Sequence, residues 1–246
     1  PLEYQATQIP GIGANGGNVY TYDIDTITID GLDHVIVVGW YYTGTENVGF
    51  VYDHNGVIGN PGTVHSLDEW IPSSEGWSTS RCSGVNNKGQ LVGFLEKVVD
   101  GDNLRVGFYL DLDVFSYTQT PTWDYVPVVP SSDYSYGRDI NNNGDVLVKY
   151  RLDGGSHAYL FNLATPTVYS TLSDPVNGDP LPVSDAILND FGQVAIDGGG
   201  GTSLLNPGVS LESLPLKGVR GINNVGTVVG SVDATVETGK GKKKST

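Results

Sequence analysis

One phrase of the sequence occurs four times, and it constrains the fold more than any other feature. In each copy an asparagine and a second polar residue are followed by one variable residue, a glycine and a short, mostly apolar run. The four copies are GVNNKGQLVGF (84–94), DINNNGDVLVKY (139–150), LNDFGQVAIDG (188–198) and GINNVGTVVGSV (221–232). A phrase that recurs at intervals of tens of residues predicts an architecture of repeated structural units.

The glycine of this phrase marks units that are 34 to 55 residues apart. It falls at Gly89, Gly144, Gly192 and Gly226. A fifth, degenerate copy precedes these four as IDGLDHVIVVGWYY (29–42), in which Asp30 and Asp33 stand near the asparagine positions. Its turn is predicted to be one or two residues longer than the others. Five copies predict five units.

Each unit contains a second apolar phrase and then a further short stretch with the composition of a strand. The second phrases are VGFVYD (48–53), VGFYLDLD (106–113), HAYLFNLA (157–164) and TSLLNPG (202–208). The 34 glycines scattered between apolar runs suit tight turns, and the 14 tyrosines, with many valines and threonines, favour strands over helices. Four short strands joined by hairpins, with about 45–50 residues per unit, are typical of a β-propeller blade.

We therefore predict an all-β fold, a five-bladed β-propeller of four-stranded antiparallel blades that forms one domain over residues 1–239. A two-sheet sandwich is the alternative, but sandwiches do not repeat one phrase five times. The last unit lacks clear third and fourth strands, while EYQATQIPG (3–11) resembles a fourth strand with no unit before it. We expect this N-terminal strand to close the last blade and ATVET (234–238) to be its third strand. Otherwise a strand from another chain could fill the gap.

The phrases also resemble a known repeat. GINNVGTVVGSV (221–232), GVNNKGQLVGF (84–94) and the HAYLF phrase (157–161) are similar to the HAF-type extracellular repeat. In that repeat an Ile-Asn-Asn-x-Gly-Gln-Val-Val-Gly phrase precedes a His-Ala-Phe-Leu phrase. The resemblance covers most of the chain, although only the copy at His157 keeps the His-Ala start. It implies β-propeller-like repeats in a secreted or surface-associated protein, and it supplies no catalytic residues.

The charge of the chain narrows the range of its partners. There are 28 acidic and 13 basic residues, a net charge of −15, and four of the lysines stand in KGKKKST (240–246), which we expect to be a flexible basic tail. So acidic a body repels nucleic acid and anionic membranes, and no apolar run approaches the ~20 residues of a membrane span. The chain starts at Pro1 and has no methionine, which predicts a processed, exported protein that is extracellular or at the cell surface. The single cysteine, Cys82, is predicted to be a buried apolar residue.

The copy that begins at residue 139 offers a candidate metal site. DINNNGD places oxygen-bearing side chains at every second position before a glycine, as the first half of a calcium loop does. The candidate ligands are Asp139, Asn141, Asn143 and Asp145. The twelfth position is Tyr150 rather than glutamate, and the other copies lack the first carboxylate, so a hairpin turn shaped by asparagine and glycine is the favoured interpretation. Calcium is the one cofactor that the sequence suggests.

Aromatic residues in loops and at strand ends are candidates for binding a ligand. Trp70 and Trp77 lie in DEWIPSSEGWSTSR (68–81), a long insertion, and we expect them to be the most exposed rings. Trp123 and Tyr134 complete the set of candidates. An aromatic ring with polar groups beside it suits the apolar face of a sugar. The alternative is that these rings pack between sheets.

Catalytic residues are suggested only by their positions. Glycosidases need two carboxylates beside a cavity, and five aspartates precede the turns or lie on the opening strands, which line a propeller channel. They are Asp23, Asp25, Asp133, Asp139 and Asp185. A lyase would instead use Tyr136 or His157 as its base and Arg138 to neutralise a uronate. The alternative is that these residues cap turns and pair locally, and no nucleophile or zinc-protease motif is present.

These features favour a non-catalytic extracellular or cell-surface β-propeller that acts as a binding or structural module, for carbohydrate or within a surface assembly. The expected partner is a carbohydrate or another surface protein. Two alternatives stay open. One is a polysaccharide-active enzyme, a glycosidase or lyase that uses Asp, Tyr or His side chains of the channel. The other is a self-assembling matrix or filament subunit, suggested by the incomplete last unit and the lysine tail.

Overall fold

The protein is an all-β molecule, and a computed structural model describes its residues 9, 18–71, 73–115, 121–199, 201–206 and 209–232. Apart from two 3₁₀ turns, Leu67–Glu69 and Ser73–Glu75, the regular structure of these residues is antiparallel strand. The strands form five sheets, of which four have four strands and the fifth has two. The predicted all-β fold with four-stranded antiparallel sheets is confirmed.

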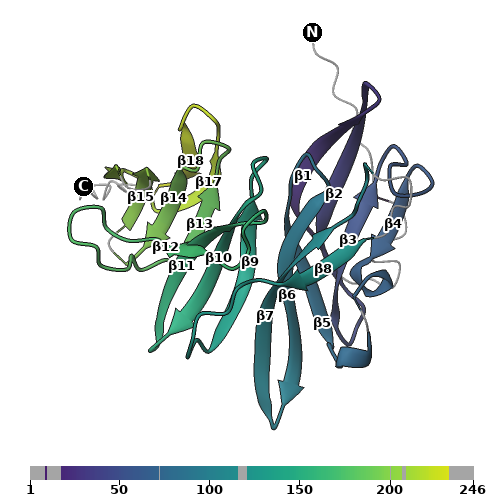
Figure 1. Ribbon diagram of the computed structural model, residues 1–246, viewed down its shortest axis with the longest axis horizontal. Helices are drawn as coiled ribbons and strands as arrows, with labels where there is room; N and C mark the ends of the chain where they lie inside the picture. The colour runs from purple at the N-terminus through teal and green to yellow at the C-terminus, as the bar shows by residue number, and fades with distance from the viewer. Residues whose placement is uncertain are drawn as a thin grey trace, which may run out of the picture.

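Each sheet is built from strands that follow one another along the chain (Figure 1). The first sheet contains β1 (Val19–Ile29), β2 (Leu32–Tyr42), β3 (Asn47–Asp53) and β4 (Thr63–Ser66). The second contains β5 (Thr79–Val85), β6 (Gln90–Val99), β7 (Asp102–Asp111) and β8 (Thr122–Tyr125). The third contains β9 (Tyr134–Ile140), β10 (Asp145–Leu152), β11 (Gly155–Asn162) and β12 (Tyr169–Thr171). The fourth contains β13 (Asp185–Leu188), β14 (Val194–Gly198), β15 (Gly201–Asn206) and β16 (Ser210–Leu214), and the fifth contains β17 (Gly218–Ile222) and β18 (Val228–Ser231).

The sheets pack face to face in chain order, with a separate apolar layer between each pair of the first four. In β6, Leu91 packs between the first and second sheets, while its neighbour Val92 packs between the second and third. In β10, Val146 and Val148 face the second sheet and Leu147 faces the fourth. Successive side chains of a strand point to opposite faces, so a sheet covered on both sides needs a continuous apolar run. The repeated phrase therefore has no polar alternation after its glycine.

The last glycine of the phrase makes room for a close approach of two strands. A Cβ atom at Gly93 would lie 2.0 Å from the main-chain oxygen of Arg81, and one at Gly39 would lie 2.0 Å from that of Tyr20. Real Cβ contacts are never this short, so only glycine fits opposite the first strand at these positions. This packing requirement explains the glycine that ends LVG in the second unit and VVG in the first.

The first sheet departs from the repeat at its β1–β2 turn. Ile29 pairs with Leu32, so the turn contains only Asp30 and Gly31. Both residues have a positive φ, 53° and 77°, as a two-residue hairpin turn requires. Four residues separate β5 from β6 and β9 from β10. The prediction of a longer turn in the degenerate copy is wrong, because a tight hairpin replaces the asparagine turn there.

The fifth sheet lies at the other end of the series from the first (Figure 1). Within the described residues it has two strands, and no strand connects it to the first sheet. The predicted closing strand at 3–11, except for residue 9, the predicted strand at 234–238 and the basic tail at 240–246 lie outside the described residues. In the part of the chain that the structure describes, no helix has the length and apolar character needed to cross a bilayer.

Candidate functional site

The repeated asparagine shapes its own turn through three hydrogen bonds. In the third sheet, Asn141 Oδ1 accepts the backbone N–H groups of Asn143 (3.0 Å) and Asp145 (2.9 Å), and the Asn141 N–H donates to the Asp145 carbonyl (3.0 Å). The same set of bonds is made by Asn86, Asn189 and Asn223. The glycine of the phrase then takes a left-handed conformation, with φ of 82° at Gly144.

The side-chain amide of the same asparagine joins one sheet to the next. Nδ2 of Asn86 donates to the main-chain oxygen of Asn141 (3.0 Å), and Nδ2 of Asn141 donates to that of Asn189 (3.0 Å). Asn189 in turn donates to Asn223 (2.9 Å). We call this series the asparagine ladder. Because it needs an asparagine at the same place in each of the last four units, it accounts for the repeated phrase without any metal.

The ladder engages the oxygen atoms that a calcium loop would need. Asn141 Oδ1 accepts two backbone N–H groups, and the two carboxylate oxygens of Asp145 accept the side-chain amides of Asn141 (3.0 Å) and Asn162 (2.8 Å). Asn143 turns its amide to a main-chain oxygen of the next sheet, and Asp139 lies on β9 with both oxygens on backbone N–H groups. Among the described residues, no three His, Cys, Asp or Glu side chains group closely enough to hold a metal ion. These bonds support the hairpin-turn interpretation.

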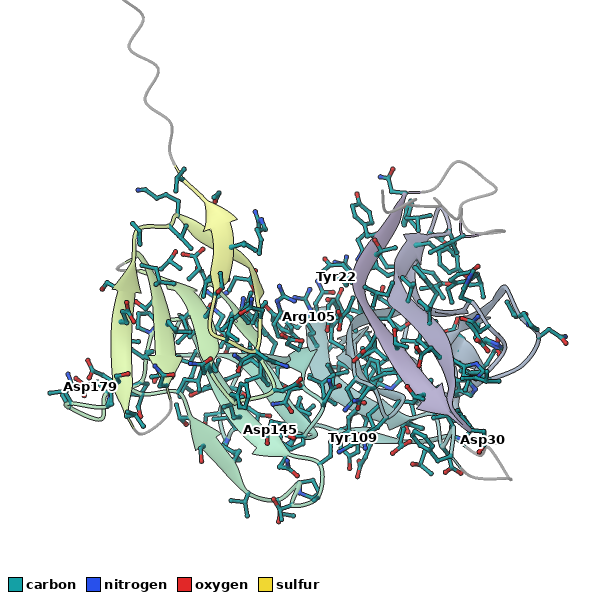
Figure 2. All side chains as sticks on the ribbon, turned by 90° about the horizontal axis from the view of Figure 1, so that it is seen from above. Tyr22, Asp30, Arg105, Tyr109, Asp145 and Asp179 are labelled. Carbon is teal, nitrogen blue, oxygen red and sulfur yellow. The ribbon has the colours of Figure 1, made fainter. Side chains whose placement is uncertain are left out.

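β-Bulges in four of the first strands redirect side chains into the middle of the molecule. The pairing register shifts at Tyr22 in β1, Ser83 in β5, Arg138 in β9 and Arg220 in β17. A bulge leaves one residue unpaired and re-aims its side chain. All four residues line cavities between the first strands of the sheets. Figure 2 shows Tyr22 far along β1 from the hairpin tip at Asp30.

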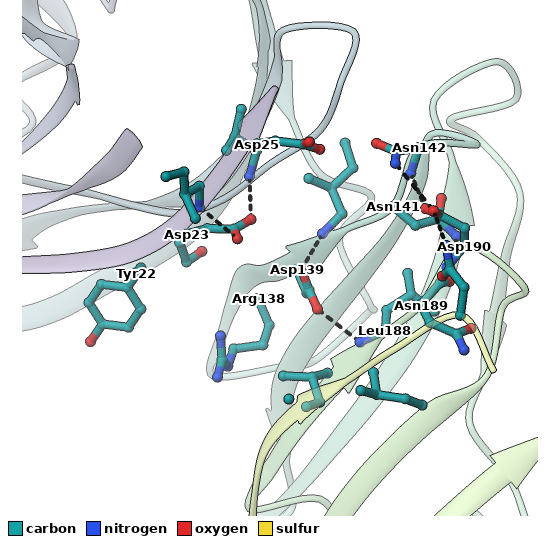
Figure 3. A pocket seen from close by; sticks show the side chains of 18 of the residues that line it. Tyr22, Asp23, Asp25, Arg138, Asp139, Asn141, Asn142, Leu188, Asn189 and Asp190 are labelled. Atoms are coloured by element: carbon teal, nitrogen blue, oxygen red, sulfur yellow. Dashed lines mark hydrogen bonds between the residues drawn. The ribbon is translucent and has the colours of Figure 1, made fainter. Parts of the chain in front are cut away.

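One of these cavities has a volume of about 290 Å³, and the first strands of all five sheets contribute to its wall. We call it the acidic cavity. Its charged lining residues are Asp23, Asp25, Arg138, Asp139, Asp190 and Arg220. Figure 3 shows Asp23 and Asp25 on β1 facing Arg138 and Asp139 on β9. Three of the aspartates considered as catalytic candidates, Asp23, Asp25 and Asp139, thus line one cavity.

Asp23 and Asp139 each connect one sheet to the next. Asp23 Oδ2 accepts the N–H of Val85 on β5 at 2.9 Å, and its Oδ1 accepts the N–H of the following residue. Asp139 repeats this arrangement, since its Oδ2 accepts the N–H of Leu188 on β13 at 2.8 Å (Figure 3). Both oxygens of each carboxylate are therefore engaged by the backbone.

Burial nevertheless makes these carboxyl groups hard to ionise. It raises the pKa of Asp23 to about 6 and that of Asp139 to about 7, against the opposing effect of the backbone N–H groups. The negative charge of Asp23 raises the pKa of Asp139 further. Burial, followed by the charge of Asp190, also raises the pKa of Asp25. The acidic cavity therefore gains and loses protons near neutral pH.

A second cavity, of about 320 Å³, shares Tyr22, Ser83 and Arg138 with the first and carries the opposite charge. We call it the cationic cavity. Its charged lining residues are Arg81, Arg105, Arg138, Lys149 and Asp185. Aromatic surface is added by Tyr22, Phe94 and Tyr136. The wall of this cavity thus has an excess of three positive charges, in a protein whose net charge is −15.

Two of the four cations have carboxylate partners. Arg138 donates to both oxygens of Asp185, at 2.7 and 3.3 Å, and Arg105 donates twice to one oxygen of Glu96, at 2.9 and 2.6 Å. Burial alone would raise the pKa of Asp185, but the hydrogen bond and charge of Arg138 lower it below its usual value. Asp185, predicted as a catalytic candidate, is therefore the ionised partner of an arginine.

The residues proposed for a lyase are only partly brought together. Tyr136 and Arg138 share the cationic cavity. Burial raises the pKa of Tyr136 above its ordinary value, so the phenol stays protonated and is a poor base. His157 lies on β11, paired with Tyr150 and packed beside its ring, and it lines neither cavity.

The aromatic candidates do not form one binding surface. Trp70, Trp77 and Trp123 pack against the apolar layer between the first and second sheets, and the last two contact Tyr125 with ring centres 6.0 and 5.1 Å apart. All three are half-buried, so the expectation that Trp70 and Trp77 are the most exposed rings is wrong. Tyr134 lies apart from them on β9. The tryptophans thus pack against the core between sheets, which was the alternative to ligand binding.

The two remaining candidates have simple surroundings. Asp133 is exposed, lies outside both cavities and forms a long ion pair with Arg151 at 3.7 Å. Cys82 is fully buried, as predicted, and burial raises the pKa of its thiol. Neither residue has surroundings that suit catalysis.

Sequence reasoning missed Arg81, Lys149 and Arg220 as site residues. Arg81 stands in STSRCSGV and Lys149 in VLVKY, each inside a strand that is otherwise small or apolar. Cations are almost never buried without a partner. A lone cation within such a strand could have indicated a site residue, and the indication is stronger in a chain with so few basic residues.

No model of a known protein family matches this chain, and no curated protein shows a significant match to it. The similarity to the HAF-type repeat therefore rests on the residues quoted above, and what it implies about function and location stays a proposal.

Proposed function

We propose that this protein is a five-bladed β-propeller, extracellular or at the cell surface, that binds a carbohydrate in the cavities between its first strands. One observation carries the proposal: the first strands of all five sheets contribute to the wall of the acidic cavity. In a β-propeller, the blades surround a central channel in the same manner. The acidity of the chain and its resemblance to an extracellular repeat support the location.

Closure of the ring requires a strand that covers the free edge of β18. We assign this role to the N-terminal segment 3–11, with 234–238 as the strand between it and β18. The two-stranded fifth sheet supports the assignment, because an uncovered edge presents unpaired N–H and C=O groups to other chains.

Binding accounts for the aspartates better than catalysis does. The carboxylate oxygens of Asp23 and Asp139 accept backbone N–H groups, and these hydrogen bonds join neighbouring sheets. The bulged side chains of Tyr22 and Arg220, by contrast, extend into the acidic cavity from opposite ends of the series of sheets. A tyrosine ring beside carboxylates and a guanidinium matches a sugar, which offers an apolar face and a rim of hydroxyl groups.

Calorimetric titration with a panel of neutral and acidic oligosaccharides tests this function. Tyr22 is exposed, so Tyr22→Ala should leave the fold intact and weaken sugar binding about three- to tenfold, the value of one aromatic contact. Tyr42→Ala is the matched control, because Tyr42 is also exposed and lines neither cavity. Absence of binding to every sugar, or equal loss in the two variants, would contradict the proposal.

A glycosidase is the second candidate, favoured by the raised pKa values of Asp23 and Asp139 in one cavity. A carboxyl group that is protonated near neutral pH can act as a general acid. Release of reducing ends from a polysaccharide, lost in Asp139→Asn but kept in Asp133→Asn, would establish this activity. If binding is measured without any release, the binding module stands alone.

A further inference from the structure

The distribution of positive charge is the feature that the proposed function leaves unexplained. Outside the tail at 240–246 the chain has nine basic residues, and four of them line the cationic cavity. An acidic protein gains nothing for solubility by gathering its few cations in one partly buried cavity. Their mutual repulsion and their desolvation both destabilise the folded state.

Arg81 is the clearest of these unexplained charges. Its guanidinium lies 4.2 Å from the ring centre of Trp40 and 5.4 Å from that of Phe94, so aromatic faces hold it in position. Its Nε atom is buried without a hydrogen-bond partner, and no carboxylate among the described residues pairs with it. Burial, which disfavours the charged form of the guanidinium, lowers the pKa of Arg81. A stacked guanidinium with free N–H groups is pre-organised to receive an oxyanion.

Lys149 adds a second charge of the same kind. It is 7% exposed on β10, and its ammonium group donates to the main-chain oxygen of Ser184 rather than to a carboxylate. Burial lowers its pKa. Arg105 and Arg138 differ, because Glu96 and Asp185 already neutralise them. Arg81 and Lys149 therefore remain on the wall of the cationic cavity without an ion-pair partner of their own, and the carboxylates of Glu96 and Asp185 act on them only from beyond contact distance.

We infer that the cationic cavity binds the carboxylate of a small acidic sugar, with Arg81 and Lys149 as the groups that recognise the charge. The inference rests on the proposed function and names the class of its ligand. The cavity volume of about 320 Å³ lies at the small end of the ~300–1,000 Å³ usual for ligand pockets. Tyr22 and Tyr136 on its wall provide ring surfaces for the body of the sugar. Nucleic acid does not fit this description, because the surrounding protein is acidic and the cavity is small.

Calorimetry with three probes of similar size separates the sources of the charge: glucuronic acid, glucose 6-sulfate and glucose. We expect glucuronic acid to bind most tightly and to lose affinity as salt is added. Arg81→Gln should weaken its binding about tenfold or more, which is the usual worth of a charged hydrogen bond. Arg151→Gln is the matched control, since Arg151 is exposed on β10 outside both cavities, and it should bind like the wild type.

Lys149→Met keeps the test independent of misfolding. Replacing a buried charge that has no ion-pair partner with an apolar side chain of similar length should raise the thermal midpoint while it weakens glucuronic acid binding by about tenfold or more. A merely structural lysine would lower both together, and that result would overturn the inference.

The remaining outcomes separate the inference from the function on which it rests. Equal binding of glucose and glucuronic acid, unaffected by Arg81→Gln, would refute the acidic ligand but keep the carbohydrate module. Tighter binding of glucose 6-sulfate would refute the carboxylate assignment. If no neutral or acidic sugar binds at all, the proposed function itself fails.

Discussion

At the scale of the residue, Asp139 joins two sheets although its burial disfavours the charged form of its carboxyl group. Its carboxylate accepts backbone N–H groups from its own strand and from β13, and so it holds the third and fourth sheets together. Each of these bonds stabilises the charged form. Burial opposes them and wins, because the pKa rises to about 7. Asp139 therefore accepts two backbone hydrogen bonds with a carboxyl group whose charged form is disfavoured by burial.

Asp139→Asn should flatten the dependence of stability on pH. The pKa of Asp139 is 3.8 in its unperturbed state and about 7 in the folded protein, so the folded state binds this proton more tightly. Its contribution is then fully present below about pH 4 and is lost as the pH rises to about 7. Three pKa units correspond to at most about 4 kcal/mol. Urea unfolding at pH 4, 5, 6 and 7 measures the slope, and Asp133→Asn, at an exposed site, should leave it as in the wild type. An unchanged slope in Asp139→Asn would contradict the raised pKa.

The candidate site was only partly predictable from single residues, and Arg81 shows why. The position of Asp23, Asp25 and Asp139 beside a cavity follows from their place on first strands. Which face a strand residue occupies follows from alternation, and the bulges at Ser83 and Arg138 reset that alternation. The sequence marks these bulges only by a nearby glycine, Gly93 on the strand opposite Ser83 and Gly137 beside Arg138 on the same strand.

At the scale of the element, the first hairpin of each unit contains most of the features that join the sheets and shape the cavities. In the last four units its turn contributes to the asparagine ladder, and in every unit but the fourth its first strand bulges toward the cavities. In the first, second and fifth units, its second strand also brings a glycine against the first strand. The four-residue turn was predictable, because asparagine and glycine have few other reasons to recur together. The ladder contacts between neighbouring turns were not, since they join residues 34 to 55 positions apart.

Gly93→Ala should disrupt this hairpin. The new Cβ atom would lie 2.0 Å from the main-chain oxygen of Arg81, which cannot move without opening the β5–β6 pairing. We expect a loss of about 2–3 kcal/mol in the free energy of unfolding, as for other overpacked sites. Gly199→Ala is the control, because no atom lies within 4 Å of a Cβ there, and it should change stability by less than about 0.5 kcal/mol. Chemical denaturation of both variants decides, and equal stability would refute the packing argument.

At the scale of the whole molecule, the repeat predicts the kind and number of sheets but not how the series ends. Five phrases led to five sheets because each phrase builds one hairpin that a sheet needs. Nothing in the phrase specifies the partner of the last strand. Within the described residues the fifth sheet accordingly has two strands, β17 and β18.

Removal of residues 1–17 tests the proposed closure. If 3–11 completes the fifth sheet, the shortened protein should lose several kcal/mol, which lowers the thermal midpoint of a chain of this size by about 5–10 °C. It should also associate through the uncovered edge, visible as a concentration-dependent scattering mass. Removal of residues 240–246 should change neither property. A full-length and an N-terminally shortened protein with the same midpoint and mass would rule out this closing strand.

The asparagine ladder also has a direction. Each amide reaches forward to the following copy, so every joint is head-to-tail and none is symmetric. Head-to-tail joints of one kind generate a ring when the rotation per step divides a full circle, and a spiral when it does not. A unit inserted between two neighbours could make the same ladder contact on each side, and after a deletion the two neighbouring units could make that contact with each other. In such a chain, the number of units is decided by how the ends meet and not by the joints between neighbours.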